Sequence, residues 1–219
     1  MTATDLTDLE KTEFAVRTIA STCLENEKYF GDLDAVVGDG DFGYSLARGF
    51  EVLLDQWDGL DRTDAGTFLT QVAMVLTSRI GGTSGPLWGT AFLRAGAKLK
   101  GLDAISGADV VAALRNSIEG IKKRGNSDLG DKTLLDALVP AVDELEAALA
   151  GGAGGSGQTR SALGRMAAVA RSSADATKEL EAKRGRASYT GERSIGSVDA
   201  GAAAVAVLIE KLAADWPED

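Results

Sequence analysis

Apolar residues recur along most of the chain at the three-to-four-residue spacing of an amphipathic helix. Asp64, Pro86 and Ser106 stand where such stripes begin, as N-cap and first-turn residues do. Only Leu33–Val37 is patterned like a short strand. The pattern therefore predicts an all-α fold, an up-and-down bundle of eight amphipathic helices. The predicted helices lie at about 7–29, 44–54, 64–80, 86–99, 106–121, 131–149, 159–183 and 197–212.

A flexible segment, Gly151–Gly157, separates the sixth predicted helix from the seventh. It consists of glycine, alanine and serine. A domain boundary there would leave too few helices on each side to enclose a core. We therefore predict a loop inside one domain that spans residues 1–219.

Glycine makes up 27 of the 219 residues, and its placement is uneven. Because glycine inside a helix costs about 1 kcal/mol relative to alanine, clusters of glycine mark loops of special geometry. Four clusters follow the first, third, fifth and seventh predicted helices. Alternate loops of an up-and-down bundle lie at the same end, so we predict that these four meet and form a ligand site. They are Gly38/Gly40/Gly43, Gly81/Gly82/Gly85/Gly89, Gly125/Gly130 and Gly185/Gly191/Gly196/Gly201.

Composition excludes several kinds of function. With no histidine and one cysteine, Cys23, the chain holds no zinc finger, haem ligation, Cys–His protease or Ser-His-Asp triad. Asp and Glu number 33 against 23 Lys and Arg, and this net charge of −10 argues against a nucleic-acid partner. No apolar run reaches the ~18 residues of a membrane span, and the first residues are too polar and acidic for a signal peptide. We expect a cytoplasmic protein with neither nucleic acid nor membrane as partner.

The first glycine cluster carries three carboxylates, Asp34, Asp39 and Asp41. Its Gly-x-Gly-x-x-Gly spacing formally matches a dinucleotide-binding fingerprint, but the acidic side chains would repel a pyrophosphate and repeated βαβ units are lacking. An EF-hand would need ligands where Gly43 and Phe50 stand. Two interpretations stay open, a Mg²⁺ site built from oxygen ligands and an acidic turn that caps the next helix.

The second and third clusters each allow a phosphate-binding and a structural interpretation. Gly81–Gly89 leads into a helix N-terminus, where free N–H groups bind anions, or it is an ordinary tight loop. Gly125–Thr133 approaches the P-loop spacing, but Asp131 interrupts it and a helix precedes it, so we reject a P-loop. Lys132 and Thr133 could still contact phosphate or metal, and Asp131 could be only the N-cap of the sixth helix.

The fourth cluster lies in a basic segment of an acidic protein. A reversal of charge confined to one loop favours anion binding over a solvated loop. Four cations fall between residues 183 and 193, namely Lys183, Arg184, Arg186 and Arg193.

The four loop sequences, taken in order, are similar to one known family. Over nearly its whole length the chain resembles the nucleotide-binding L subunit of bacterial dihydroxyacetone kinases, which is also the C-terminal half of the single-chain, ATP-dependent enzymes. The resemblance implies an up-and-down barrel of eight helices with the nucleotide at one end. It also implies phosphotransferase activity on an alcohol acceptor, with two Mg²⁺ ions that bridge the phosphates of ADP or ATP. The sequences are Leu33-Asp-Ala-Val-Val-Gly-Asp-Gly-Asp-Phe-Gly43, Gly81-Gly-Thr-Ser-Gly-Pro-Leu-Trp-Gly89, Gly130-Asp-Lys-Thr-Leu-Leu-Asp136 and Gly185-Arg-Ala-Ser-Tyr-Thr-Gly-Glu-Arg-Ser-Ile-Gly196.

The resemblance also implies roles for individual residues. Asp34, Asp39 and Asp41 match the Mg²⁺ ligands, and Arg186 matches a catalytic basic residue that faces the phosphates. Twelve positions match nucleotide contacts, two of them on the adenine side. The twelve are Phe42, Gly43, Tyr44, Ser45, Thr83, Ser84, Gly125 and Leu134 (the adenine pair), Arg186, Asp199, Ala200 and Gly201.

Three of these positions depart from the family pattern. Phe42 stands where the family usually has His, Thr83 where Ala is common, and Ala200 where Pro is common. Phe42 removes a polar group beside the phosphates. This change bears on nucleotide retention, on the phosphoryl donor, and on whether the acceptor is dihydroxyacetone or another short ketose such as a tetrulose.

The family holds its ketose covalently on a histidine of a separate K subunit, and this chain has no histidine. We therefore predict the phosphoryl-donating half of a two-part kinase. Its donor is either free ATP or a bound ADP that a phosphotransferase-system protein, the M subunit, rephosphorylates. The alternatives are a regulatory nucleotide-binding module that signals to a transcription factor, an oxidoreductase, and a relative that serves a fatty-acid kinase.

Overall fold

The computed structural model describes residues 6–150 and 157–217 and is helical throughout these ranges, with no strand in them. Eight long helices are joined by one short helix, α2, and by 3₁₀ segments. The α-helices are α1 (Asp8–Glu25), α2 (Glu27–Asp34), α3 (Phe42–Asp55), α4 (Ala65–Arg79), α5 (Ser84–Leu99), α6 (Gly107–Gly125), α7 (Leu135–Ala150), α8 (Gln158–Ala176) and α9 (Ala200–Asp215). The 3₁₀ segments are η2 (Trp57–Gly59), η3 (Thr177–Glu179) and η4 (Arg186–Ser194).

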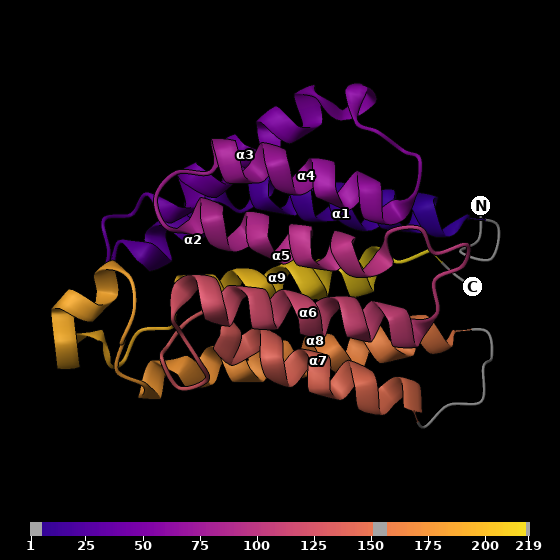
Figure 1. Ribbon diagram of the computed structural model, residues 1–219. Helices are drawn as coiled ribbons and strands as arrows, with labels where there is room; N and C mark the ends of the chain where they lie inside the picture. The colour runs from indigo at the N-terminus through magenta and orange to yellow at the C-terminus, as the bar shows by residue number, and fades with distance from the viewer. Residues whose placement is uncertain (1–5, 151–156, 218–219) are drawn as a thin grey trace.

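The long helices run up and down and close into a ring. Each packs on the next along the chain, α1 packs on α3, and α9 returns to pack on α1. Figure 1 shows the start of α1 and the end of α9 at the right-hand end and the four glycine-rich loops at the left-hand end. The predicted all-α bundle of eight amphipathic helices is confirmed, and the four loops do meet at one end. We call this end the loop end and the opposite one the terminal end.

The core is filled by aromatic side chains near α3 and by small ones around α9. Phe30, Phe50 and Phe68 are fully buried. Alanine is buried at four positions of α9, which lets neighbouring helices approach closely. Glycine does the same between α4 and α5, where a Cβ on Gly66 would lie 2.3 Å from the backbone N of Lys100. Burial of this apolar surface, at about 25 cal/mol per Å², holds the loop end in place.

The strand-like pattern at Leu33–Val37 does not form a strand, in keeping with the predicted all-α fold. Leu33 and Asp34 are the last two residues of α2, and the following residues form a turn in which the N–H of Ala35 donates to Gly31 O at 2.9 Å. A short apolar run fits strand or helix by pattern alone, and the described part of the chain offers no strand to pair with it. The first predicted helix is also interrupted, because Asn26 has φ −107° and ψ 14° between α1 and α2.

Two other helix boundaries differ from the prediction. The helix predicted from residue 131 begins at Leu135, since Lys132 has φ +59° and cannot continue a right-handed helix. The helix predicted to residue 183 ends at Ala176. The predicted loop Gly151–Gly157 falls between α7 and α8, and its residues 151–156 lie outside the described residues. Within the described ranges no helix is long and apolar enough to cross a membrane.

Candidate active site

Three carboxylates meet at the loop end, between α2 and α3. Asp34 ends α2, and Asp39 and Asp41 follow in the turn. One carboxylate oxygen from each lies within 4.8 Å of the others. Glycine makes the turn possible, because a Cβ at Gly38 would lie 2.4 Å from Oδ1 of Asp34, and Gly40 has φ +77°. The fold thus brings together the residues that were expected to bind Mg²⁺.

The surroundings of Asp34 disfavour its charge. Partial burial raises the pKa of this carboxyl, and Asp39 and Asp41 raise it further, against the lowering effect of the Phe42 and Gly40 backbone N–H groups. A divalent cation would compensate for such crowding of like charges. Because the donors are all oxygen, with no nitrogen or sulfur among them, the set fits Mg²⁺.

Arg186 reaches the carboxylates from the other side of the loop end. Its guanidinium forms an ion pair with Asp39 and a second, longer one with Asp41, at 3.9 Å. Arg186 begins η4, a segment that Gly191 interrupts with φ +58° and that projects at the left of Figure 1. A cation beside an acidic cluster that could hold a metal ion is an arrangement that can stabilise the charge of a transferring phosphoryl group.

Two of the long helices begin at the loop end without a side-chain cap. They are α3, which follows Asp41, and α5, which follows Thr83. Their first turns keep backbone N–H groups and the positive end of the helix dipole available to an anion. The two starts adjoin, since a Cβ on Gly81 would lie 3.1 Å from Oγ of Ser45. Ser84 is the first residue of α5. The arrangement can hold a phosphate chain next to a metal ion.

The first turn of α3 divides its side chains between core and solvent. The ring of Phe42 packs on Phe30, with 6.2 Å between centroids, so what Phe42 presents toward the carboxylates is its N–H, 3.4 Å from Asp34 Oδ2. A Cβ on Gly43 would lie 2.0 Å from Glu27 O, so glycine is required where α3 crosses α2. Tyr44 is 57% exposed. The ring of Phe42 is therefore partly buried and packs against the core.

The remaining predicted nucleotide contacts lie in the other loops, each close to the start of a neighbouring helix. A Cβ on Gly125, at the end of α6, would lie 3.2 Å from Leu87 in the first turn of α5. A Cβ on Gly201 would lie 3.3 Å from Cβ of Leu134, which places the start of α9 beside the start of α7. Ala200 is the first residue of α9.

Asp199 caps α9, in contrast to the open starts of α3 and α5. Its carboxylate accepts a hydrogen bond from the Ala202 N–H at 2.7 Å. Desolvation raises the pKa of Asp199 to about 7, and the charge of Asp136 adds to the rise, against the lowering effects of the Ala202 N–H and of Lys132. Asp199, itself a predicted nucleotide contact, is thus a carboxyl whose burial disfavours its charge.

The family follows from the sequence as a whole. Residues 36–214 match the DAK2 domain. The chain belongs to the DAK2 domain family. It is 35% identical over 189 residues to the ADP-binding subunit DhaL of the PEP-dependent dihydroxyacetone kinase of Escherichia coli K12, over 85% of this chain and 87% of that subunit.

Two longer proteins contain a similar DAK2 domain. The L-erythrulose 1-kinase of Mycolicibacterium smegmatis is 36% identical over 199 residues, which is 90% of this chain and 34% of that protein. The crystal structure of the C. freundii dihydroxyacetone kinase in complex with AMP-PNP and Mg²⁺ superposes with a TM-score of 0.72 and 28% identity. The match covers 91% of this chain and 33% of that one, so this chain spans about a third of its length.

In this DAK2 domain the connection between α6 and α7 has a structural role that sequence reasoning missed. Lys132 is 2% exposed, and its ammonium donates to backbone carbonyls, so it is not placed to contact phosphate. Asp131 does not cap α7. Its carboxylate pairs with Arg184 at 3.0 Å, while Asp136 accepts from the Thr133 N–H at 2.7 Å. One sequence feature could have indicated this structural role, namely Asp136, an acidic residue within the apolar start of α7.

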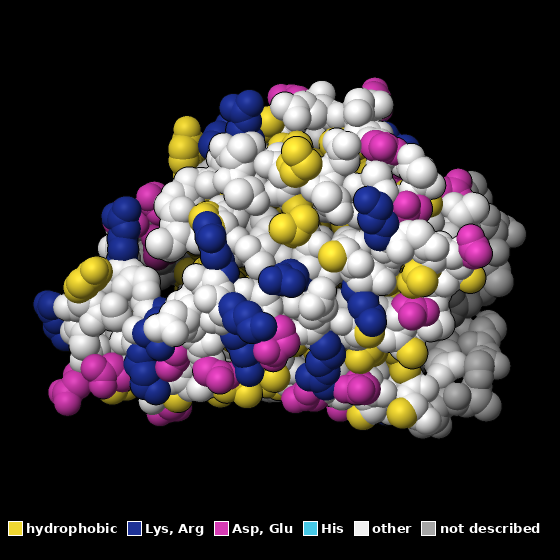
Figure 2. Space-filling model, viewed as in Figure 1, with side chains coloured by type: hydrophobic (Ala, Val, Ile, Leu, Met, Phe, Trp, Pro, Cys, Tyr) yellow, Lys and Arg dark blue, Asp and Glu magenta, His cyan; other side chains and the backbone are white. Residues whose placement is uncertain are grey.

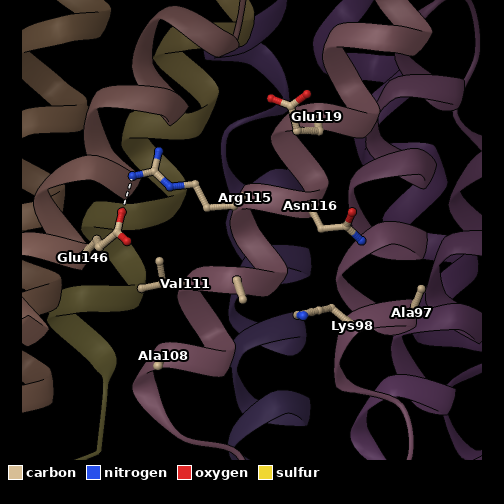
Figure 3. Close-up of a pocket in the computed structure, with 9 residues that line it drawn as sticks. Ala97, Lys98, Ala108, Val111, Arg115, Asn116, Glu119 and Glu146 are labelled. Atoms are coloured by element: carbon tan, nitrogen blue, oxygen red, sulfur yellow. Dashed lines mark hydrogen bonds and ion pairs between the residues drawn. The ribbon is translucent and has the colours of Figure 1, made fainter.

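The DAK2 domain also has a shallow groove of about 560 Å³ on its flank, between α5 and α6. Figure 3 shows Arg115 pointing across this groove to Glu146 of α7, with which it forms an ion pair. Arg115 also pairs with Asp143, at 2.5 Å. Lys98 and Ala108 place the groove toward the terminal end, away from the carboxylates. Its charged residues tie α6 to α7 and are separate from the candidate active site.

Proposed function

We propose that this chain is the ADP- or ATP-binding, phosphoryl-donating subunit of a kinase that acts on dihydroxyacetone or a related short-chain ketose. The observation that carries the proposal is the meeting of Asp34, Asp39 and Asp41 with Arg186 beside two uncapped helix starts. Membership of the DAK2 domain family supports it, since relatives are named for an ADP-binding subunit and for ketose kinases.

Each group has a proposed task. Asp34, Asp39 and Asp41 hold Mg²⁺, in our proposal two ions, which neutralise phosphate charge. The first turns of α3 and α5, with Ser45, Thr83 and Ser84, donate to the phosphates, and Arg186 stabilises charge during transfer. The C. freundii relative with AMP-PNP and Mg²⁺ supports this choice of ligand. We propose that the remaining nucleotide contacts are Phe42, Gly43, Tyr44, Gly125, Leu134, Asp199, Ala200 and Gly201.

A partner subunit has to supply the acceptor. We propose a K subunit that holds the ketose on a histidine, because this chain has none. Exposed apolar side chains around the carboxylates support a contact surface there, led by Tyr189, which is 89% exposed. At the left tip of Figure 2, hydrophobic, basic and acidic side chains are exposed together on η4. The apolar members at the loop end are Val36, Tyr44, Leu129, Tyr189 and Ile195.

The proposal also includes the source of the phosphoryl group. The E. coli relative is named PEP-dependent, which supports a bound ADP that is rephosphorylated by an M subunit of the phosphotransferase system. ADP that stays bound through dialysis would favour this route over exchange of free ATP. We also propose a cytoplasmic location, in keeping with the lone Cys23.

The test is a coupled assay with the purified chain, its K subunit, ketose, ATP and Mg²⁺. We expect turnover, and we expect Asp39→Asn to lower it by more than about 100-fold, because loss of a metal ligand costs several kcal/mol of transition-state stabilisation. Asp103→Asn is the matched control, an exposed Asp in the α5–α6 connection at the terminal end. It should leave the rate unchanged.

Two results would contradict the proposal. One is a wild-type chain that gives no turnover with any donor, including a phosphorylated M subunit. The other is an Asp39→Asn rate equal to that of Asp103→Asn. Mg²⁺-dependent binding of ADP, measured by calorimetry, separates a binding failure from a transfer failure.

A further inference from the structure

The segment that carries Arg186 makes little contact with the core. We call residues 183–197 the excursion. Arg186 has a 63% exposed side chain, Tyr189 is 89% exposed and Ile195 is 48% exposed. Because the excursion buries little apolar surface, its position depends on how its two ends are held. We call these two ends, where the chain leaves and rejoins the bundle, the base of the excursion.

Lys132 holds that base from inside. Its ammonium donates to the carbonyl oxygens of Leu180 at 3.1 Å, Ser194 at 2.5 Å and Ser197 at 2.7 Å. Leu180 precedes the excursion, whereas Ser194 and Ser197 lie where the chain returns. An ammonium has three donors, and all three are used here. One buried side chain therefore links the chain segment that enters the excursion to the segment that leaves it.

The neighbouring residue, Asp131, holds the base from outside. Its backbone oxygen accepts from the Lys183 N–H at 3.0 Å, and its carboxylate pairs with Arg184 at 3.0 Å and Lys183 at 3.5 Å. At the inner edge, Oγ of Ser194 accepts from the Ala182 N–H at 2.9 Å. The α6–α7 connection thus holds both ends of the excursion, through Asp131 and Lys132.

The fold keeps Lys132 in this place at a cost. Its φ of +59° is a left-handed conformation that is unfavourable for a residue with a side chain. Burial lowers the pKa of its ammonium, against the effect of Asp199, so desolvation also disfavours it. Such strain persists only where the surrounding contacts outweigh it.

We propose that Lys132 is a positioning residue that fixes the excursion so that Arg186 faces Asp39 and Asp41. The role of Arg186 in transfer rests on the proposed function above, whereas the clamp itself does not. Removal of the ammonium should free the excursion while the helices stay folded, and transfer should then slow because Arg186 is no longer held in place.

The test compares Lys132→Met with Lys122→Met. Methionine keeps the length of the lysine stem and removes all three donors, while Lys122, in the last turn of α6, only pairs with exposed Asp128 at 2.7 Å. Hydrogen exchange followed by mass spectrometry reports on residues 183–197, where the Gly196 N–H donates to Lys178 O at 2.7 Å. We expect exchange there to speed up by about tenfold or more in Lys132→Met, with α3 and α5 unchanged.

A second readout comes from the coupled assay. In Lys132→Met we expect kcat to fall about tenfold or more, with a smaller change in KM for ATP, and we expect Lys122→Met to match the wild type in both measurements. Faster exchange in every helix of Lys132→Met would mean that this variant is destabilised as a whole. In that case Lys132→Gln, which retains an amide donor, is measured by the same two readouts.

Unchanged exchange in the excursion would overturn the proposal, and so would faster exchange without an effect on kcat. A failure of the proposed function looks different, since the wild-type chain itself would then show no turnover. The exchange experiment would still decide whether Lys132 clamps the excursion.

Discussion

Helices that begin at the two ends of the bundle differ in how their first turn is satisfied. At the terminal end, side chains of Thr7, Asp64 and Ser106 cap α1, α4 and α6. At the loop end, α3 and α5 begin without a side-chain cap, whereas Asp199 caps α9 there and α8 begins without a side-chain cap at the terminal end. A capped start has used its N–H groups on its own chain. The open starts of α3 and α5 retain theirs, and these two lie beside the carboxylates, where the N–H groups can serve an anion.

The backbone shows the same division. Ten described residues have positive φ, and eight of them lie in the four loops of the loop end. Such conformations are costly for residues with a side chain, and two of the eight, Asn126 and Lys132, are not glycine. Left-handed backbone conformations therefore lie mostly at the loop end, where the carboxylates and the open starts of α3 and α5 also lie. The eight are Gly40, Gly82, Asn126, Gly130, Lys132, Gly185, Gly191 and Gly196.

The largest expected difference between the ends concerns Arg186. Arg186→Gln should lower kcat by about 10³-fold, or ~4 kcal/mol, because a cation aimed at the transferring phosphoryl group acts mainly in the transition state. The affinity for Mg²⁺ and ADP, measured by calorimetry, should change less than about tenfold. Steady-state kinetics with the K subunit measure the effect.

Arg193→Gln is the control for this variant, since Arg193 lies in the same excursion and only approaches Thr190 O, at 3.4 Å. It should retain the wild-type kcat. Equal losses in the two variants would show that the excursion acts through its overall charge.

Asp199 should give the loop end a pH dependence of stability. Its pKa is about 7 in the folded chain, because desolvation raises it above the ordinary ~3.9. The folded state therefore binds the proton more tightly than the unfolded state. This contribution is fully present below about pH 4 and is lost as pH rises through 7.

The measurement is urea unfolding at pH 5 and pH 8 without nucleotide. Relative to Asp199→Asn, whose amide oxygen can still accept from Ala202, the wild type should lose on the order of 2 kcal/mol across this interval. An identical pH dependence in both proteins would show that Asp199 ionises freely in the fold.

Helix positions and the meeting of the loops could be predicted because both depend on local patterns. Hydrophobic periodicity is local, and the order of loops in an up-and-down bundle follows from counting helices. Asp34, Asp39 and Asp41 lie within eight residues of one another, so their proximity was also visible in the sequence.

What could not be predicted depends on partners far away in sequence. Lys132 resembles a phosphate ligand until its contacts with Leu180, Ser194 and Ser197 are known. The ring of Phe42 faces the core because Phe30 of α2 is there to receive it. The run at Leu33–Val37 ended as helix and turn because no neighbouring strand was available to pair with it.

The smallest effects should separate the two kinds of helix start. Asp64→Ala removes the acceptor of the Thr67 N–H, at 2.8 Å, and should cost about 1 kcal/mol of unfolding free energy with no change in ADP affinity. Thr83→Asp, before the open start of α5, should do the reverse. A negative charge there favours the helix dipole by about 0.3–1 kcal/mol but repels phosphate, so the Kd for ADP with Mg²⁺ should rise about tenfold.

Urea unfolding and calorimetry on the same two variants test this reversal. Thr63→Ala is the control for a substitution at the terminal end that removes no helix cap, because the Thr63 hydroxyl bonds only the exposed Asp61, at 2.6 Å. If Asp64→Ala weakened ADP binding as much as Thr83→Asp, the ends would be coupled and the division between them would fail. If Thr83→Asp instead left Kd unchanged, the start of α5 would not contact phosphate, and the open N–H groups of α3 would have to hold the phosphates alone.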